Sequence, residues 1–225
     1  MKNITRIAMR FLLMLDNVVS KLINRLAIPY DGGVHVKHRL MRYHDFFVNR
    51  IAPGERVLDI GCGYGAVAYS LATKAGALVT GVDLNEVNVA KARGRFHHPN
   101  LTFVHGDART NLPPGPWDVL VLSNILEHIE QRASFLTELQ QGLRPNRMLI
   151  RVPMIDRDWR VPLREELGMF HFGDATHFTE YTAESFEKEV TVAGLSIHHV
   201  QYNWGEIWAE VVPATFSDAL GSRSS

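Results

Sequence analysis

From residue 55 onward the chain alternates short apolar runs with longer amphipathic stretches. Five apolar runs, rich in branched side chains and bounded by Gly, Pro, Asp or Asn, predict strands at 56–60, 78–82, 101–104, 119–122 and 148–152. Helical periodicity between them predicts helices at 67–75, 86–96 and 132–143. Strands that alternate with helices in this way are typical of a parallel sheet covered by helices on both faces. We therefore expect an α/β, doubly wound, Rossmann-like fold.

The pattern changes after residue 153. Residues 154–180 mix Asp, Arg, Trp, His and Phe without a clear period, which predicts a long loop above the sheet that acts as a substrate lid. A helix is expected at 183–193. Two β-rich runs at 195–202 and 206–212 have only a short connection between them, which predicts a C-terminal antiparallel hairpin. We expect one domain at 31–215, with the lid inserted in it, and a frayed tail at 216–225.

The first 30 residues combine basic and apolar positions, and as a helix they form an amphipathic extension. Their longest apolar run, 11–15, is far shorter than the ~20 residues of a membrane span, and the arginines argue against a signal peptide. In one interpretation the apolar face of residues 1–28 packs on the fold or on a second subunit, as in a homodimer. In the other, the helix lies in a membrane interface with its basic face toward anionic headgroups.

Composition narrows the partners and the location. The chain has 24 basic and 24 acidic residues, so it has no global positive field, and we expect no nucleic-acid partner. Its single cysteine excludes an internal disulfide and is typical of a reducing compartment. The expected location is the cytoplasm, at the inner membrane face if the first helix binds lipid. The 11 histidines are scattered and form no H-E-x-x-H pair, so we expect no metal site.

A glycine-dense turn follows the first predicted strand. Gly61, Gly63 and Gly65 lack the side chains that would keep a ligand away from the backbone. Asp83 ends the next strand, where a carboxylate can accept hydrogen bonds from both hydroxyls of a ribose. Asp107 follows the third strand, in position to reach an adenine amino group. Ligands of open α/β sheets bind at the carboxyl ends of strands, so these residues together predict a nucleoside-containing ligand.

Residues 57–65 resemble motif I of class I S-adenosylmethionine-dependent methyltransferases, with Asp59 at its acidic position. The spacing to Asp83, the His-Gly-Asp-Ala run at 105–108, and the segments 117–119 and 127–129 are similar to the motifs that follow. The resemblance covers about residues 35–212 and is closest to the broad bacterial small-molecule and glycan branch called type 11. It implies a seven-stranded, mostly parallel sheet with a final antiparallel hairpin. It also implies S-adenosylmethionine as cofactor and S-adenosylhomocysteine as product.

The resemblance also implies roles for single residues. Asp59 steadies the glycine loop, which Gly65 completes. The residues that it places around the cofactor are Gly61, Cys62 and Gly63 at the methionine part, Asp83 at the ribose, Leu84, Asp107 and Ala108 at the adenine, and Ser123 and Asn124 near the amino-acid end. A basic cluster precedes the loop, and Arg39 is its best-suited group for the cofactor carboxylate, because a guanidinium binds carboxylates through two hydrogen bonds. The alternative for Arg39 is a solvated helix face.

A sulfonium is an activated methyl donor, so the protein must mainly align donor and acceptor and exclude water. An alcohol acceptor also needs a base for its proton, and histidine suits this task because its pKa is near neutrality. We predict His128 or His177 as this base: His128 lies about one helical turn beyond Asn124, and the resemblance places a residue of the acceptor pocket at His177. The alternative for each is a packed structural histidine. The acceptor site predicted within 154–180 comprises Asp156, Trp159, Arg160, Arg164 and His171.

The function that follows is O-methylation of a hydroxyl on a glycan, a lipid-linked intermediate or a small metabolite. Alternatives are N- or C-methylation of a metabolite, and a non-catalytic partner subunit that binds S-adenosylmethionine. A more remote alternative is an NAD-dependent dehydrogenase, which also uses glycines and a later acid. The glycine spacing after Asp59 and the terminal hairpin argue against it.

Overall fold

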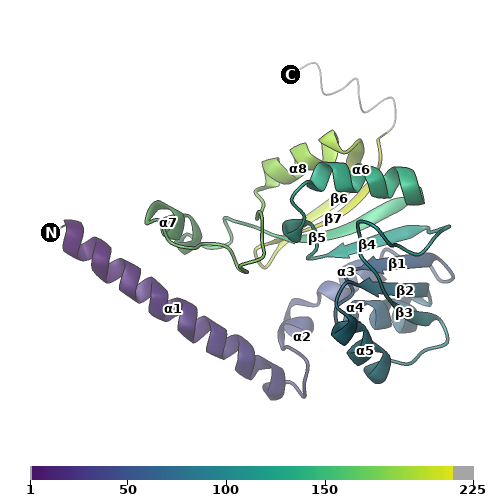
Figure 1. The fold of residues 1–225 in the computed structure, drawn as a ribbon, viewed down its shortest axis with the longest axis horizontal. Coiled ribbons are helices and arrows are strands. Elements are labelled where there is room, and N and C mark those ends of the chain that lie inside the picture. Colours follow the sequence, from purple (N-terminus) through teal and green to yellow (C-terminus); the bar gives the residue numbers. More distant parts are fainter. Residues whose placement is uncertain (1, 215–225) are drawn as a thin grey trace.

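A seven-stranded sheet forms the centre of the computed structural model, which describes residues 2–214 (Figure 1). The strand order is β3-β2-β1-β4-β5-β7-β6. The parallel strands are β1 (Arg56–Ile60), β2 (Leu78–Asp83), β3 (Leu101–His105), β4 (Val119–Ser123) and β5 (Arg147–Pro153). A hairpin of β6 (Leu195–Asn203) and β7 (Glu206–Pro213) adds antiparallel to β5. The expected α/β fold, with a mostly parallel sheet and a C-terminal antiparallel hairpin, is thus confirmed.

Helices cover both faces of the sheet (Figure 1). One face carries α3 (Tyr43–Val48), α4 (Ala66–Ser70) with the π-helical turn η1 (Leu71–Ala75), and α5 (Glu86–Arg95). The other face carries α6 (Arg132–Leu143) and α8 (Ala183–Val192). Successive residues of β4 alternate between the two cores, so that Val119 packs with α3–α5 and Leu120 with α6 and α8. Because both faces are buried, the central strands form continuous apolar runs in the sequence.

The strand order reverses between β1 and β4. The chain leaves β1 toward β2 on one side, and β4 leads to β5 on the other. Connections that diverge in this way leave a crevice at the carboxyl ends of the strands, where α/β sheets bind their ligands. The predicted cofactor residues of β1, β2 and β4 all lie at this edge.

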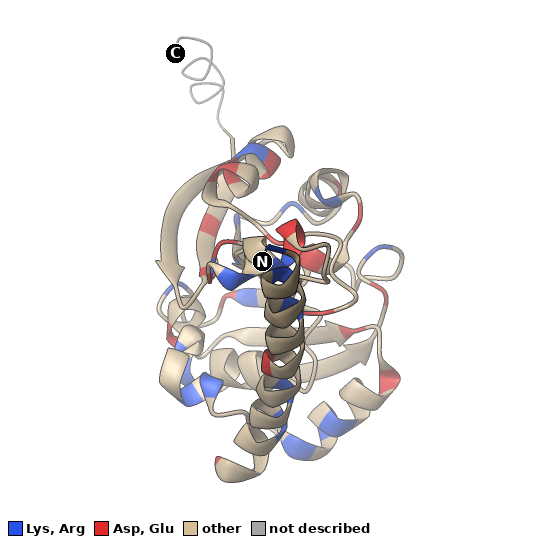
Figure 2. Cartoon of the chain, turned by 90° about the vertical axis from the view of Figure 1, so that its left-hand side faces the viewer, with Lys and Arg blue, Asp and Glu red and all other residues tan. Residues whose placement is uncertain are grey.

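The first helix, α1 (Lys2–Tyr30), crosses in front of the rest of the chain in the view of Figure 2. It docks through polar contacts: Asp16 binds Arg160 and Arg164, and Arg10 donates to the Leu167 carbonyl. Its buried residues are Leu13 and Ala27. Its apolar face does not pack on the fold. The side chains of this face, each at least 43% exposed, are Ile4, Ile7, Phe11, Leu12, Met14, Leu15, Val18, Val19, Leu22, Ile23, Leu26 and Ile28.

Segment 154–180 is more regular than the sequence predicts. It contains a helix, α7 (Arg160–Glu166), whose first residue is held by the Asp158 carboxylate: Oδ1 accepts from the Arg160 amide at 2.9 Å. Seven residues are too few to show a helical period in the sequence. No helix among residues 2–214 has both the length and the apolarity needed to cross a bilayer. The tail predicted at 216–225 lies outside the described residues.

Candidate functional site

The turn after β1 has a backbone that requires glycine. Gly61 and Gly65 have φ angles of 70° and 81°, in the left-handed region that other residues rarely adopt. A Cβ on Gly61 would lie 1.9 Å from Ile125 Cδ1, and a Cβ on Gly65 would lie 2.4 Å from Phe103 Cζ. Gly61 therefore lets the loop after β4 approach the turn, whereas Gly65 serves packing beneath it.

Asp83, at the end of β2, holds the glycine turn from the neighbouring strand. Its Oδ2 accepts from the Gly63 amide at 2.8 Å, and its Oδ1 accepts from the Asn85 amide at 2.9 Å and from Asn88 Nδ2 at 3.1 Å. A carboxylate has about four acceptor positions, so three protein donors leave capacity for a ligand hydroxyl. The side chain is 8% exposed and lines the crevice.

Two adjoining cavities occupy the crevice and share Gly61 and Asn124. The Asp83 cavity, of 470 Å³, is also lined by Leu84, Asp107, Ala108 and His128. The Asp59 cavity, of 430 Å³, is also lined by Cys62 and Ser123. The structure thus brings together most of the residues predicted for the cofactor. Among the predicted glycines, Gly63 and Gly65 shape the turn without lining either cavity.

Asn124 lies where the two cavities meet and has the features of a ligand contact. Its backbone is left-handed, with φ of 58°, and its Oδ1 is buried without a hydrogen-bond partner among the described residues. A buried amide oxygen of this kind calls for a donor, which the ammonium group of an amino acid supplies. A molecule that spans both cavities, with a nucleoside at Asp83 and an amino-acid group at Asn124, therefore fits the polar atoms of the crevice.

Burial disfavours the charged forms of two groups of the Asp59 cavity. It raises the pKa of Asp59 to about 7 and raises the pKa of the Cys62 thiol, in the latter case with help from Asp59 and Asp83. A thiol with a raised pKa is a poor nucleophile. Cys62 is accordingly a wall of the cavity rather than a reactive group.

The basic cluster before the glycine loop reaches the cavity through residues other than Arg39. Arg39 is 58% exposed in its side chain, pairs with Asp31 at 3.0 Å and lines neither cavity of the crevice. Instead Lys37, His38 and Tyr43 line the Asp59 cavity. Arg39 faces outward because α2 (Lys37–Met41) turns Lys37 and His38 inward, and a helix cannot present all its neighbouring positions to one side.

Arg151, on β5, is a residue of the Asp59 cavity that the sequence interpretation missed. It is 3% exposed, pairs with Glu206 at 2.5 Å and lies 3.8 Å from the centroid of the Tyr43 ring. Its signal in the sequence is a charge inside the otherwise apolar strand 148–152. Arg151 and Lys37 give this cavity a positive wall, and burial followed by repulsion from Arg151 lowers the pKa of Lys37.

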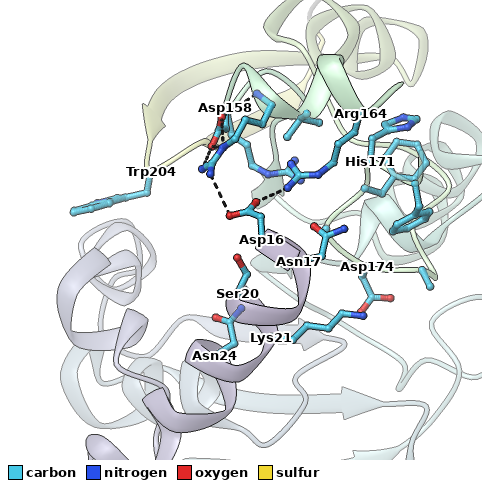
Figure 3. Close-up of a pocket in the computed structure, with 17 residues that line it drawn as sticks. Asp16, Asn17, Ser20, Lys21, Asn24, Asp158, Arg164, His171, Asp174 and Trp204 are labelled. Carbon is cyan, nitrogen blue, oxygen red and sulfur yellow. Dashed lines mark hydrogen bonds and ion pairs between the residues drawn. The ribbon is translucent and has the colours of Figure 1, made fainter. Parts of the chain in front are cut away.

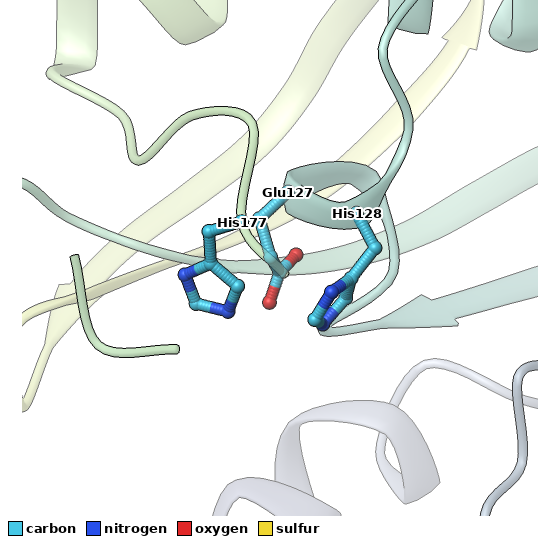
Figure 4. Close-up of side chains that lie close together, drawn as sticks. All are labelled: Glu127, His128 and His177. Atoms are coloured by element: carbon cyan, nitrogen blue, oxygen red, sulfur yellow. The ribbon is translucent and has the colours of Figure 1, made fainter. Parts of the chain in front are cut away.

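The two histidines predicted as bases lie together beside the Asp83 cavity. Their ring centroids are 4.8 Å apart, and Glu127 lies between them (Figure 4). His128 belongs to η2 (Leu126–His128), and the Phe178 amide donates to the Glu127 carbonyl at 2.8 Å, which ties the end of segment 154–180 to η2. Burial and the neighbouring His177 lower the pKa of His128, and burial raises the pKa of Glu127 to about 8. In the sequence analysis Glu127 is only part of a motif and is not predicted as a site residue.

The residues predicted for the acceptor divide into two groups. Arg160, Arg164 and His171 line a cavity of 750 Å³ between α1 and the segment around α7, which we call the α1–α7 cavity (Figure 3). Asp156 and Trp159 do not line it, and the Trp159 side chain is 73% exposed. The two arginines are already paired with Asp16 of α1, so they fasten the helix to the fold.

Comparisons with known proteins agree with this geometry. A family model described as a methyltransferase domain matches residues 33–200. The Schizosaccharomyces pombe protein named ubiquinone biosynthesis O-methyltransferase, mitochondrial, is 31% identical over 132 residues, which are 54% of this chain and 48% of that protein. A Mycolicibacterium smegmatis fatty-acid O-methyltransferase is 36% identical over 111 residues, or 48% of this chain and 40% of that protein. The matches thus span about half the length of these relatives or less.

A solved structure shows the same fold. The magnesium protoporphyrin IX methyltransferase of Synechocystis PCC 6803, solved with bound S-adenosylhomocysteine, has a TM-score of 0.64 and 21% identity to this chain. The similarity covers 80% of this chain and 85% of that protein.

Proposed function

Since this chain belongs to the class I S-adenosylmethionine-dependent methyltransferases, we propose that it methylates a hydroxyl oxygen of a lipid-linked acceptor. The observation that carries the proposal is the pair of adjoining cavities at the ends of β1, β2 and β4, with His128 and His177 at their edge. Two relatives whose names specify O-methyl transfer, one in ubiquinone biosynthesis and one on fatty acids, support oxygen as the acceptor atom and a lipid as its carrier.

The residues of the crevice orient the cofactor in this proposal. Asp83 accepts from a ribose hydroxyl, Leu84, Asp107 and Ala108 contact the adenine, and Asn124 accepts from the amino group. Lys37, rather than Arg39, meets the carboxylate, because it lines the Asp59 cavity. The bound cofactor supplies a methyl group that is already activated by its sulfonium. The protein contributes alignment and exclusion of water.

Removal of the acceptor proton falls to the histidine pair. His128 lines the Asp83 cavity, and its Nδ1 lies 2.9 Å from the Thr176 hydroxyl, so that Nδ1 is engaged and Nε2 is left for the acceptor. Positioned proton transfer of this kind contributes typically ~10²–10⁴ in rate. His177 holds the ring of His128 from its edge.

The amphipathic helix α1 supports a lipid as the carrier. Its exposed apolar face is flanked by Arg6, Arg10, Lys21 and Arg25, a pattern that favours the surface of an anionic membrane. The same helix borders the Asp59 cavity, which Ile28 lines, and the α1–α7 cavity, to which residues 16–24 contribute. A membrane surface that binds α1 therefore lies next to the site.

Turnover with simple acceptors tests the reaction. We expect S-adenosylhomocysteine to form with para-octylphenol, octyl glucoside or octanoic acid, and not with octylamine, which has the same chain but a nitrogen. Turnover with the amine alone would refute O-methylation. Absence of turnover with every acceptor, by protein that binds S-adenosylhomocysteine, would favour the non-catalytic partner subunit.

Co-sedimentation with vesicles tests the membrane contact. Full-length protein should sediment with vesicles of phosphatidylglycerol and less with vesicles of phosphatidylcholine. Phe11→Glu and Leu22→Glu, on the exposed face of α1, should abolish sedimentation, while Val192→Glu, an equally exposed apolar position on α8, should not. Equal sedimentation of all variants would refute the contact. A stable dimer that Leu22→Glu dissociates would assign the face to a second copy instead.

A further inference from the structure

Glu127, His128 and His177 form a cluster, and the proposed proton transfer uses the two histidines but assigns no role to Glu127. Each residue offers one donor atom, and the three atoms all lie within 4.8 Å of one another. The carboxylate lies between the two imidazoles (Figure 4). His128 also lines the Asp83 cavity, so the cluster adjoins the crevice.

The hydrogen bonds around the two rings determine which nitrogen carries the proton. The Thr176 hydroxyl donates to Asp174 Oδ1 at 2.7 Å, so its oxygen accepts from His128 Nδ1–H at 2.9 Å. Glu180 Oε1 is a carboxylate oxygen, 3.0 Å from His177 Nδ1, and accepts a hydrogen bond from Nδ1–H. A neutral imidazole protonated at Nδ1 carries its lone pair on Nε2. Both histidines are therefore in the tautomer that offers Nε2 as a ligand.

The groups that accept from the Nδ1 atoms of His128 and His177 are themselves held in place by further contacts. Glu180, with a fully buried side chain, also accepts from the Gly173 amide and pairs with Arg157. Asp174 accepts from the Thr176 amide at 2.8 Å as well as from its hydroxyl. Metal-binding histidines almost always donate their second nitrogen to a carboxylate, a carbonyl or water in this manner, which fixes the ring and raises its basicity.

Glu127 provides an independent observation. Its side chain is 0% exposed, and neither carboxylate oxygen has a hydrogen-bond partner among the described residues. A buried carboxylate without partners is costly, and native proteins rarely retain one without a function. Two imidazoles and an unpartnered carboxylate thus lie within 4.8 Å of one another by their ligand atoms, and a cation bound among them would satisfy all three.

We propose that Glu127, His128 and His177 bind a divalent first-row transition-metal cation beside the methyl-transfer site, which reverses our expectation from sequence that the chain has no metal site. Two imidazoles and one carboxylate suit Mn²⁺, Fe²⁺, Co²⁺ or Zn²⁺. Three protein ligands leave at least one coordination position, which is the arrangement of catalytic rather than structural sites.

The role of the cation rests on the proposed function. When it is bound, the Nε2 lone pairs are ligands and no longer act as the base. The acceptor hydroxyl takes the open position, and the positive charge lowers its pKa, so that its proton leaves to solvent water. The oxygen then forms the new bond to the methyl carbon as the bond between that carbon and sulfur breaks. The sulfonium leaves as the neutral thioether of S-adenosylhomocysteine.

Cobalt binding tests the site without substrate or turnover. Full-length protein is freed of metal with a chelator, titrated with Co²⁺, and followed by its visible absorption, by calorimetry and by the thermal midpoint. We expect one Co²⁺ per chain and a higher midpoint in its presence, because a ligand that binds only the folded state stabilises it. Glu127→Gln and His177→Gln should each weaken binding by at least ~10-fold, the smaller effect seen even for residues that contact a ligand rather than the metal.

Matched variants separate the cluster from general effects. Glu138→Gln and His198→Gln change the same residue types on α6 and β6, outside the cluster, and should bind Co²⁺ as the unchanged protein does. Thr176→Val removes the acceptor of His128 Nδ1–H and should weaken binding by ~10–100-fold. The proposal fails if folded protein that binds S-adenosylhomocysteine binds no Co²⁺, or if Glu127→Gln binds it unchanged.

Turnover then distinguishes this proposal from the proposed function. Oxygen methylation that is at least ~10-fold faster with Co²⁺ or Mn²⁺ than in metal-free protein supports the role of the cation. Equal rates with and without metal overturn that role while O-methylation stands. Cobalt binding without turnover on any oxygen acceptor supports the site and refutes O-methylation.

Discussion

Asp83 offers the sharpest test of how the crevice binds its cofactor. Asp83→Asn keeps the shape of the side chain but replaces one oxygen with an NH₂ group. In either orientation this NH₂ faces an N–H donor, at Gly63 on one side or at Asn85 and Asn88 on the other. The variant also loses the charge that strengthens a bond from a ribose hydroxyl.

The magnitude follows from the bonds lost. A hydrogen bond to a charged group contributes ~1.5–3 kcal/mol, and ~1.4 kcal/mol corresponds to a tenfold change in affinity. We therefore expect the Kd for S-adenosylhomocysteine to rise by about 10- to 150-fold in Asp83→Asn. Two opposed buried donors should also lower the free energy of unfolding by ~1–3 kcal/mol. Isothermal titration calorimetry and urea unfolding measure the two effects.

Asp118→Asn is the matched control. Asp118 Oδ2 accepts from the Arg56 amide at 2.8 Å, which is the same kind of bond that Asp83 makes with Gly63, but at the opposite edge of the sheet. This variant should lose less stability than Asp83→Asn, because its bond is exposed, and should bind S-adenosylhomocysteine as the unchanged protein does. If Asp83→Asn binds normally, or if both variants lose affinity equally, Asp83 does not hold the ribose.

Three further variants test other parts of the site. Gly61→Ala should destabilise the fold by at least ~1–3 kcal/mol and abolish cofactor binding, because the backbone of Gly61 is left-handed and a Cβ there would clash with Ile125. Urea unfolding measures the loss of stability and calorimetry the loss of binding, and normal cofactor binding by the variant would contradict the prediction. Arg151→Met leaves the largely buried Glu206 with only Trp208 Nε1 as a side-chain donor within residues 2–214, so the free energy of unfolding should fall by up to ~3–5 kcal/mol in urea, and a fall below ~1 kcal/mol would show that the pair is not needed. Burial raises the pKa of Asp59 to about 7, above the ~4 of an unfolded aspartate, so the unfolded state ionises first and stability should fall as pH rises from 4 to 7. Asp59→Asn should reduce this fall, measured as the thermal midpoint at pH 5 and 7.5, and an unchanged pH dependence would contradict the assignment.

The sheet and the cofactor crevice could be predicted because their signals are local in the sequence. β4 is buried on both faces, so that nearly every residue of the strand is apolar. Gly61 and Asp83 end adjacent parallel strands, and parallel strands bring their carboxyl ends to one edge whatever the rest of the chain does. The sequence therefore predicted which residues meet without any knowledge of helix packing.

The parts that could not be predicted depend on contacts between distant segments. Deciding between Arg39 and Lys37 required the phase of a five-residue helix, which α2 is too short to reveal. The orientation of α1 depends on Asp16 pairing with arginines of α7, more than 140 positions later in the chain. Nothing in the sequence distinguishes Glu127 from other motif residues, and only the structure shows that its carboxylate is buried without a hydrogen-bond partner among the described residues.

The orientation of α1 connects the membrane proposal with the chemistry. Because Asp16 fixes the polar side of the helix to α7, most of the apolar side is exposed, and Ile28 at its end lines the Asp59 cavity. In the proposed membrane contact, a bilayer that covers the apolar side lies parallel to α1. An acceptor with a hydrocarbon tail can leave that tail in the bilayer and bring only its hydroxyl past α1 to the histidines. In this arrangement the crevice needs no apolar tunnel for the tail.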